Sequence, residues 1–394
     1  AAGFLGDALH ELEAKQGEPH PNAQCHQASL LAKAGRKEEA AQMATRIDRT
    51  DPALCRPNRL EDLHAMEQAM VLHPDGSRAA YALGNQLYDR DRFEEAITCW
   101  EAAAKADAGF AAAHRNLAMA LFDKRHDLRG AKAAMQAAFA AAPTDACILY
   151  EWLQLQKNVD DVPVSDRLRL VEAQTDLAFQ RNDLYVEWMI LLLQAGRFDE
   201  AAERIVARPY DVYEGGEGRL VRVYEWICIL RGLSMLDAGE PGKALAEILR
   251  ARTLPDCFHE GRNQHASTSH IHWFAGLAAH ASGKADEAES LFRLACEGPS
   301  MLSDLAFYRG KALERTGRNA EAEALFREMA KAGAALVEKG GRYDHFATGV
   351  PTPAPYEGDR ARRNRSEGHL LEALAHAGLG DLPTARETLE AVLT

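Results

Sequence analysis

The sequence predicts an all-α fold, a right-handed superhelical solenoid of helical hairpins, from three observations. A turn of the type Gly-Arg/Lys-x-x-Glu-Ala recurs at 35–40, 91–96, 196–201, 239–244, 283–288, 317–322 and 380–385. The alanines of two successive turns, Ala288 and Ala322, are 34 residues apart, which is enough for one helical hairpin. Aromatic residues make up only 7% of the chain. Because Ala is abundant while Val, Ile and Thr are sparse, the composition favours helices over a β-sandwich.

The turn motif accounts for both helices of a hairpin. Its Gly ends the first helix in a left-handed conformation, and its acidic residues open the second helix, where the helix dipole favours them. We expect the Ala to lie at the centre of the second helix, buried against the first. A small residue is needed where the two helices cross, and it stands twelve residues before the Ala, as Gly84, Gly232, Gly276 and Gly310. Large side chains four residues after the Ala should fill the groove to the next repeat: Trp100, Ile248, Phe292 and Phe326.

Five segments depart from this period, and insertions in a solenoid often form loops on its binding face. They are 53–76, with a helix at Arg59–Leu72, then 144–181, 208–223, 255–271 and 338–365. The sequence therefore suggests four parts. Residues 1–76 form an N-terminal repeat and linker helix, and 77–207 form repeats with a degenerate unit near 111–143. Residues 208–337 form repeats with Gly-rich and His-rich insertions, and 338–394 a loop and C-terminal capping repeat.

Charge narrows the classes of partner. The chain has 394 residues, and its 46 Lys and Arg against 59 Asp and Glu give a formal net charge of −13. A strongly acidic chain is a poor match for a polyanion, so we expect neither nucleic acid nor a membrane as a partner. No apolar run approaches the roughly 20 residues that a membrane helix needs.

Cysteine usage and motif content predict a cytoplasmic protein without metal or cofactor. The seven cysteines are scattered and no two form a Cys-x-x-Cys pair, which argues against a disulfide framework or a zinc ribbon. The sequence contains no nucleotide-phosphate loop, no Gly-x-Ser-x-Gly and no Cys/His catalytic arrangement. Residues 1–4 include no Met and no signal peptide, which is typical of an internal segment or a processed start.

The recurring unit resembles the tetratricopeptide repeat, whose period is about 34 residues. Residues from about 78 onward are more closely similar to the C-terminal helical region of a family of large bacterial proteins. Those proteins carry a galactose-mutarotase-like β-sandwich domain of unknown function before their repeats. The stretches that carry this resemblance are 82–89, 100–101, 115–118, 213–218 and 343–347. The resemblance implies a role in carbohydrate metabolism, although this sequence has no run of strands for such a sandwich.

The most unusual motif is Tyr-Glu-Gly-Gly-Glu-Gly at 213–218, where three glycines permit backbone geometry that other residues resist. Glu214 and Glu217, beside Tyr213 and Trp226, suit the hydroxyls and the apolar face of a sugar. Paired carboxylates can also cleave a glycosidic bond. In the alternative, the motif is a structural turn whose Glu217 caps the next helix. If it is a site, we expect these residues to face a concave pocket together with the 255–272 loop.

A second polar cluster comprises His259, Glu260, His265, His270 and His272. On a helix, His270 and His272 would lie about 200° apart, on opposite faces. We therefore predict no metal site here, because metal ligands need matched spacing on a rigid element. His259 and Glu260 are candidates for lining the same pocket as the 213–218 motif, and the alternative is a solvated polar loop that leads into a helix.

Other polar and aromatic residues have simpler interpretations. Asn85 and Asn116 stand at inner positions of first helices, where repeat proteins often bind a peptide backbone. The alternative for them is a hydrogen bond between repeats. Trp152, Trp188 and Trp273 are spaced among Leu and Ile as core residues.

Two functions remain open from the sequence. The first is a non-catalytic recognition scaffold that binds a protein domain or peptide in its concave groove and supports a carbohydrate-active module, with a carbohydrate as a further candidate ligand. The rival is a glycoside-processing enzyme with Glu214, Glu217 and Glu260 in or near its active site. In an enzyme the carboxylates would converge on a pocket, whereas in a scaffold they would cap helices or face solvent. Whether the chain is an enzyme stays undecided at this level.

Overall fold

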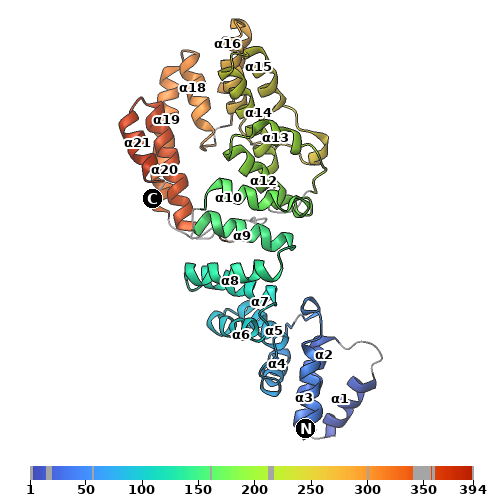
Figure 1. Ribbon diagram of the computed structural model, residues 1–394. Coiled ribbons are helices and arrows are strands. Elements are labelled where there is room, and N and C mark those ends of the chain that lie inside the picture. Colours follow the sequence, from blue (N-terminus) through green and yellow to red (C-terminus); the bar gives the residue numbers. More distant parts are fainter. Residues whose placement is uncertain are drawn as a thin grey trace. The chain divides into compact units, whose positions relative to one another are not determined.

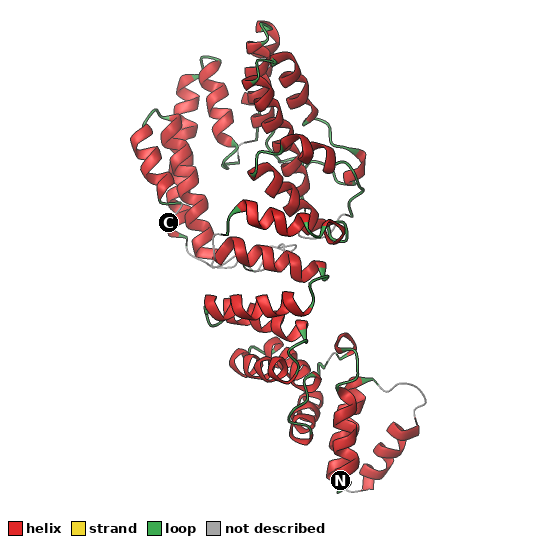
Figure 2. Ribbon diagram, in the orientation of Figure 1, coloured by secondary structure: helices red, strands yellow, loops and turns green. Residues whose placement is uncertain are grey.

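The computed structural model describes residues 3–14, 20–55, 57–159, 162–211, 217–299, 301–339, 356 and 360–392. This described part consists of helices joined by turns and loops, without a strand (Figure 1 and Figure 2). The predicted all-α solenoid of helical hairpins is thereby confirmed. The chain divides into two compact units, unit 1 over Ala1–Asp160 and unit 2 over Asp161–Thr394. The four-part division by repeats stays a prediction. Among the described helices, none has the length and apolar character to cross a membrane.

The described residues of unit 1 form three hairpins and three further helices. The hairpins are α2 (Pro21–Lys33) with α3 (Lys37–Ile47), α5 (Arg78–Asp89) with α6 (Phe93–Ala106), and α7 (Ala111–Asp123) with α8 (Leu128–Ala141). The further helices are α1 (Gly3–Ala14), α4 (Leu60–Leu72) and α9 (Ala146–Val159), and a 3-10 helix, η1 (Pro52–Leu54), precedes α4. The helix expected at 59–72 is α4, with Arg59 as its N-cap.

In the part of unit 2 that the structure describes, two short helices come first and five hairpins follow. The short helices are α10 (Val164–Glu172) and α11 (Thr175–Ala178). The first three hairpins are α12 (Asn182–Gln194) with α13 (Phe198–Arg204), α14 (Arg219–Asp237) with α15 (Pro241–Arg250), and α16 (Ser269–Ala281) with α17 (Ala285–Cys296). They are followed by α18 (Ala306–Arg315) with α19 (Asn319–Glu338) and α20 (Arg360–Gly378) with α21 (Leu382–Glu390). A 3-10 helix, η2 (Asp256–Phe258), lies between α15 and α16.

The Ala of the turn motif is buried in every hairpin that carries the motif, as predicted. Its exposure does not exceed 8% at Ala40, Ala96, Ala201, Ala244, Ala288, Ala322 and Ala385. The position differs from the prediction, because the Ala lies in the first turn of the second helix and not at its centre. In α17, for example, Ala288 is the fourth residue. The Ala is buried this early because the short turn brings the start of the second helix directly against the first.

The large side chain four residues after the Ala packs within its own hairpin. Trp100, Ile248, Phe292 and Phe326 lie directly over the crossing glycines Gly84, Gly232, Gly276 and Gly310, respectively. We expected these side chains to fill the groove to the next repeat. Phe326 does both, since it also lies against Gly378 of the next first helix. The small residue is therefore needed to admit an aromatic or branched side chain, as well as to let two backbones approach.

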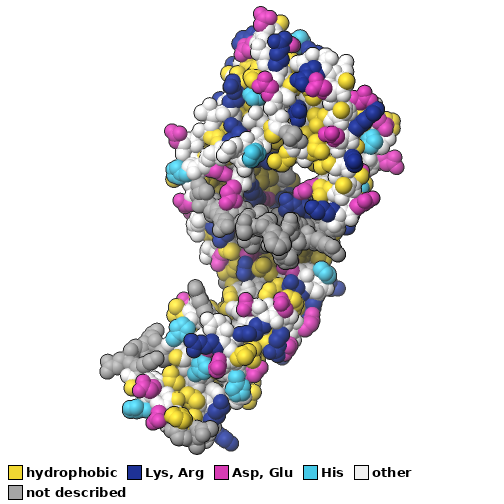
Figure 3. Space-filling view, turned by 180° about the vertical axis from the view of Figure 1, so that it is seen from behind, with side chains coloured by type: hydrophobic (Ala, Val, Ile, Leu, Met, Phe, Trp, Pro, Cys, Tyr) yellow, Lys and Arg dark blue, Asp and Glu magenta, His cyan; other side chains and the backbone are white. Residues whose placement is uncertain are grey.

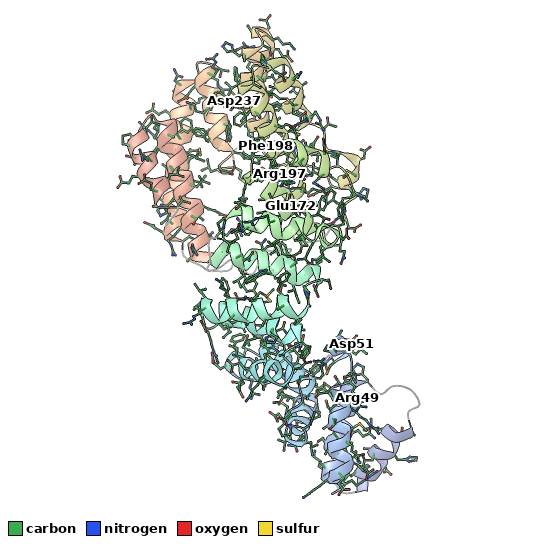
Figure 4. The ribbon with its side chains drawn as sticks, viewed as in Figure 1. Arg49, Asp51, Glu172, Arg197, Phe198 and Asp237 are labelled. Atoms are coloured by element: carbon green, nitrogen blue, oxygen red, sulfur yellow. The ribbon has the colours of Figure 1, made fainter. Side chains whose placement is uncertain are left out.

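The Arg or Lys and the Glu of the turn motif form an ion pair across the start of the second helix. Arg92 and Glu95 lie 2.6 Å apart, and Arg36 with Glu39 and Arg318 with Glu321 repeat this geometry. The hydrogen bond from Arg92 lowers the pKa of the Glu95 carboxyl. In unit 2 the turn arginine also reaches an earlier helix, because Arg197 lies 2.5 Å from Glu172 of α10 (Figure 4). At this turn the arginine therefore both pairs with the Glu of its own motif and contacts an earlier helix.

Candidate functional site

The two insertions that the sequence singled out in unit 2 contact each other. The backbone N–H of Gly218 donates a hydrogen bond to the carboxylate of Glu260. The Nδ1 atom of His259 lies 2.8 Å from the carbonyl oxygen of Tyr210, and the N–H of Tyr210 donates to the Cys257 carbonyl at 2.9 Å. The segment that ends at Gly218 and the loop that begins at Pro255 are thus joined by three polar contacts.

The structure describes some of the predicted site residues and places them in different surroundings. Tyr213 and Glu214 lie outside the described residues. Glu217 is exposed just before α14, whose N-cap is Gly218 in a left-handed conformation (φ 75°). His259 is exposed and also has positive φ (51°). Of the predicted residues that are described, Glu260 and His259 take part in the contact between the insertions, while Trp226 lies elsewhere, on α14.

An aromatic anchor holds the loop that begins at Pro255, so this loop is less solvated than the sequence suggested. Phe258 is 1% exposed, and its ring lies 5.5 Å from that of Tyr210 and 5.3 Å from that of Tyr224. Burial raises the pKa of both tyrosines. Their hydroxyls donate to the backbone carbonyls of Ile205 and Arg250, respectively. This buried cluster holds the loop against Tyr224 of α14.

Each insertion also supplies an arginine to a buried glutamate. Arg219, directly after Gly218, lies 3.0 Å from Glu187, whose side chain is fully buried on α12. Arg262, in the middle of the loop, lies 2.8 Å from Glu225 of α14. Taking a carboxylate out of water is costly unless a cation accompanies it. The insertions are therefore built into the core of unit 2, a role that no sequence motif signalled.

Trp226 belongs to an aromatic cluster on three successive first helices, which we call the aromatic patch: Trp226 on α14, His270 and Phe274 on α16, and Tyr308 on α18. The ring of Trp226 lies 5.7 Å from His270, 6.3 Å from Phe274 and 6.2 Å from Tyr308. His270 is fully buried and its Nε2 lies 3.2 Å from Glu225, while the other three rings are half-buried. Sequence reasoning singled out Trp226 and His270 but missed Phe274 and Tyr308, because their proximity arises only when the helices stack.

In unit 1, polar side chains link the first helices α5 and α7 and the further helix α9. Asn116 donates to the Oδ1 atom of Asn85 at 2.9 Å, and the Trp100 indole donates to the same atom at 3.1 Å. Arg115 forms an ion pair with the buried Glu151 of α9. The hydrogen bond between repeats that was one alternative for Asn85 and Asn116 is therefore present. We call Tyr81, Asn85, Arg115 and Asn116 the first-helix face of unit 1.

The described part of unit 1 also has two surface grooves that contain none of the predicted site residues. One, of about 390 Å³, is lined by residues of α2 and α4, among them His26 and His64. The other, of about 360 Å³, is lined by the turns after α5 and α7, including Phe93 and Lys124. No group of three or more His, Cys, Asp or Glu side chains that could hold a metal occurs among the residues described. All seven cysteines are free thiols.

Family models described as tetratricopeptide repeat match residues 81–146, and also 269–293 with 366–391. Among solved structures, the chain is similar to YrrB, described as a tetratricopeptide repeat protein with an unusual peptide-binding site. That likeness has 12% identity and a TM-score of 0.24, and it covers 60% of this chain and 92% of that one. A tetratricopeptide repeat protein from Parabacteroides merdae matches at 15% identity and a TM-score of 0.30, covering 66% and 91% of the two chains. The matched segments include α5 to α8 of unit 1 and the hairpins α16–α17 and α20–α21 of unit 2. The chain therefore contains tetratricopeptide repeats over residues 81–146, 269–293 and 366–391.

Proposed function

We propose that this chain is a non-catalytic recognition scaffold and that the first-helix face of unit 1 binds an extended segment of a partner protein. The observation that carries the proposal is the orientation of the Asn85 amide. Two donors, Trp100 Nε1 and Asn116 Nδ2, converge on Asn85 Oδ1. Only the amide oxygen of Asn85 can accept these two hydrogen bonds. The positions of its oxygen and nitrogen are therefore fixed and cannot be exchanged.

The Nδ2 atom of Asn85 is consequently directed away from these two donors. It has no hydrogen-bond partner among the described residues, and the side chain is half-buried. A half-buried donor gains from an acceptor supplied by a ligand. An extended peptide offers such acceptors at its backbone carbonyls. The face lies within the stretch 81–146 that the tetratricopeptide repeat model matches, which adds support.

The experiment is the nearly isosteric substitution Asn85→Asp. It keeps an oxygen for Trp100 and Asn116 and replaces the two free N–H donors by a second acceptor. We would select peptides from a random twelve-residue library on the full chain and measure their affinities by fluorescence anisotropy. We expect Asn85→Asp to weaken binding about tenfold or more, because an acceptor would face an acceptor. The matched control is Asn319→Asp, which adds the same charge at an exposed position. Equal affinities for Asn85→Asp and the parent chain would contradict the proposal.

Other features of the sequence interpretation stay predictions, and they rest on the resemblance, on the 213–218 motif and on cysteine usage. These are the attachment of a carbohydrate-active module, a carbohydrate ligand and a cytoplasmic location. The glycoside-processing alternative has weaker support, because the Glu260 carboxylate already accepts a hydrogen bond from Gly218 and holds the insertions together. We propose the same positioning role for His259, whose ring contacts the Tyr210 carbonyl.

A further inference from the structure

In unit 1, the turns after α5 and α7 hold a lysine ammonium over two aromatic rings. The Nζ atom of Lys124 lies 4.2 Å from the ring centroid of Phe93 and 5.7 Å from that of Tyr88. The two ring centroids are 4.9 Å apart and the ring planes meet at 63°, so the rings form a corner. The ring of Tyr88 also lies 5.4 Å from that of the buried Trp100, which packs the corner against the core. Faces of aromatic rings attract cations, and aromatic corners bind quaternary ammonium ligands in proteins.

The groove of about 360 Å³ described above lies at this corner. Its lining includes Phe93 and Lys124. A groove of this volume is within the range of pockets that hold small ligands. The side chain of Lys124 is exposed, and its ammonium forms no ion pair or hydrogen bond among the described residues. The aromatic rings are therefore its principal contacts.

The charges that line the groove favour a cation. The lining contains two basic side chains against four carboxylates, which are Asp91, Glu94, Glu95 and Asp123. On the face drawn in Figure 3, cationic side chains lie among anionic ones, and in the groove Glu95 pairs with Arg92 and Glu94 with Arg125. Within the described part of the chain, the carboxylates of Asp91 and Asp123 form no ion pair or side-chain hydrogen bond. Desolvation raises the pKa of the Asp123 carboxyl, although Lys124 and His126 act in the opposite direction. A further cation would therefore compensate charge that the protein leaves unpaired.

Asp91 adopts a backbone conformation that glycine adopts more easily. Position 91 begins one of the seven turn motifs, and the other six begin with Gly. The φ angle of Asp91 is 59°, in the same left-handed region as the glycines of those turns, such as Gly196 at 73°. A side chain in this region costs stability relative to Gly. Such an outlier at the edge of a groove supports a role for the carboxylate.

We infer that the corner formed by Tyr88 and Phe93 is a binding site for an alkylammonium group, and that Lys124 occupies it in the absence of a ligand. The ring faces would contact the methyl or methylene groups of the ligand, and Asp91 and Asp123 would balance its charge. Lys124 can give way because it is exposed and its four-carbon stem is flexible. The ligand is either a small quaternary ammonium ion or the amine of a lysine side chain, since both present the same chemistry. The inference goes beyond the proposed peptide recognition and does not depend on it.

The test measures the affinity of the full chain for tetramethylammonium chloride by saturation-transfer NMR, with sodium chloride added to keep the ionic strength constant. Lys124→Ala should raise the affinity about two- to tenfold, because it removes the competing ammonium. The matched control is Lys105→Ala, which removes the same charge at an exposed position of α6 and should leave the affinity nearly unchanged. In the Lys124→Ala background, Phe93→Leu and Asp123→Asn should each lower the affinity about threefold. Thermal melts check that the variants fold.

Asp91→Gly separates a role in binding from a role in the turn. It should raise the melting temperature, because glycine adopts the left-handed conformation more easily, and it should lower the affinity about twofold. A changed melting temperature with unchanged affinity would overturn the assignment of Asp91 to the site.

Two results would overturn the whole inference. One is the absence of saturation transfer to tetramethylammonium in both the parent chain and Lys124→Ala, and the other is an equal affinity of these two proteins. A second probe, n-butylammonium, distinguishes the sources of the ligand. Tighter binding of tetramethylammonium would support a quaternary ammonium, and tighter binding of n-butylammonium would support an unmodified lysine side chain. Because neither probe is a peptide, these results are independent of the outcome for Asn85→Asp.

Discussion

The indole of Trp100 lies directly over the α-carbon of Gly84, so that a β-carbon at position 84 would come within 2.6 Å of the indole nitrogen. The same indole donates its N–H to Asn85, the next residue on α5. One side chain of the second helix therefore both closes the hairpin and orients the amide of the proposed peptide site. Packing and recognition are coupled at this crossing.

We expect Gly84→Ala to destabilise the chain by about 1–3 kcal/mol, because the added methyl group must displace the Trp100 ring from a filled space. Chemical denaturation monitored by circular dichroism measures the change. The control is Gly242→Ala in α15, where nothing lies within 4 Å of the new atom. There the substitution should stabilise the helix by about 0.5–1 kcal/mol, since Ala has less unfolded-state entropy to lose. Equal effects of both substitutions would contradict this account of the crossing.

Ala288→Leu should cost about 1–3 kcal/mol through overpacking, because Ala288 is 2% exposed in the first turn of α17. The control is Ala320→Leu, which makes the same substitution at an exposed position of α19 and should leave the free energy of unfolding nearly unchanged. Urea midpoints of the two variants and the parent chain give the comparison. An unchanged midpoint for Ala288→Leu would show that the register of the repeats is wrong.

Arg262→Gln should destabilise unit 2 by about 3 kcal/mol, because Glu225, 6% exposed, would lose its strongest cationic partner. The double variant Arg262→Gln with Glu225→Gln should recover part of this loss, since no charge then remains buried without a cation. The surface pair Arg386–Glu390 provides the control, because Arg386 is 83% exposed and Arg386→Gln should have little effect. If the double variant is no more stable than Arg262→Gln alone, the unpaired Glu225 carboxylate is not the cause of the destabilisation.

Stability should fall as the pH drops from about 6.5 towards 4, in part through His272. Burial, with the nearby Arg252, lowers the pKa of His272 from 6.5 to about 4. The unfolded chain therefore takes up a proton in this window before the folded chain does, so that acid favours unfolding. Because the ring is partly exposed, solvent screening reduces the effect. We expect His272 to lower the free energy of unfolding by about 1 kcal/mol between pH 7 and pH 5. His272→Gln should reduce the pH dependence by that amount, whereas His10→Gln, on the exposed surface of α1, should not.

The sequence by itself determined the helical hairpins, because their signals are local. The turn motif recurs with its Ala, Gly and charged residues at fixed spacing, and most of these residues act within one hairpin. Gly84 stands twelve residues before Ala96, and that spacing alone indicated the crossing. The predicted helix at 59–72 was recognisable for the same reason, since prolines at 57 and 74 bound it.

Only the tertiary structure decided which side chains meet across repeats. The orientation of the Asn85 amide depends on donors 15 and 31 residues away. The pairing of Arg222 with Asp304 joins residues 82 positions apart, across a whole hairpin. Such contacts follow from how successive hairpins stack, and the length and packing of the insertions set that stacking. The periodicity within one hairpin contains no information about these contacts, so the sequence specified the repeats but not the hydrogen bonds that orient side chains between them.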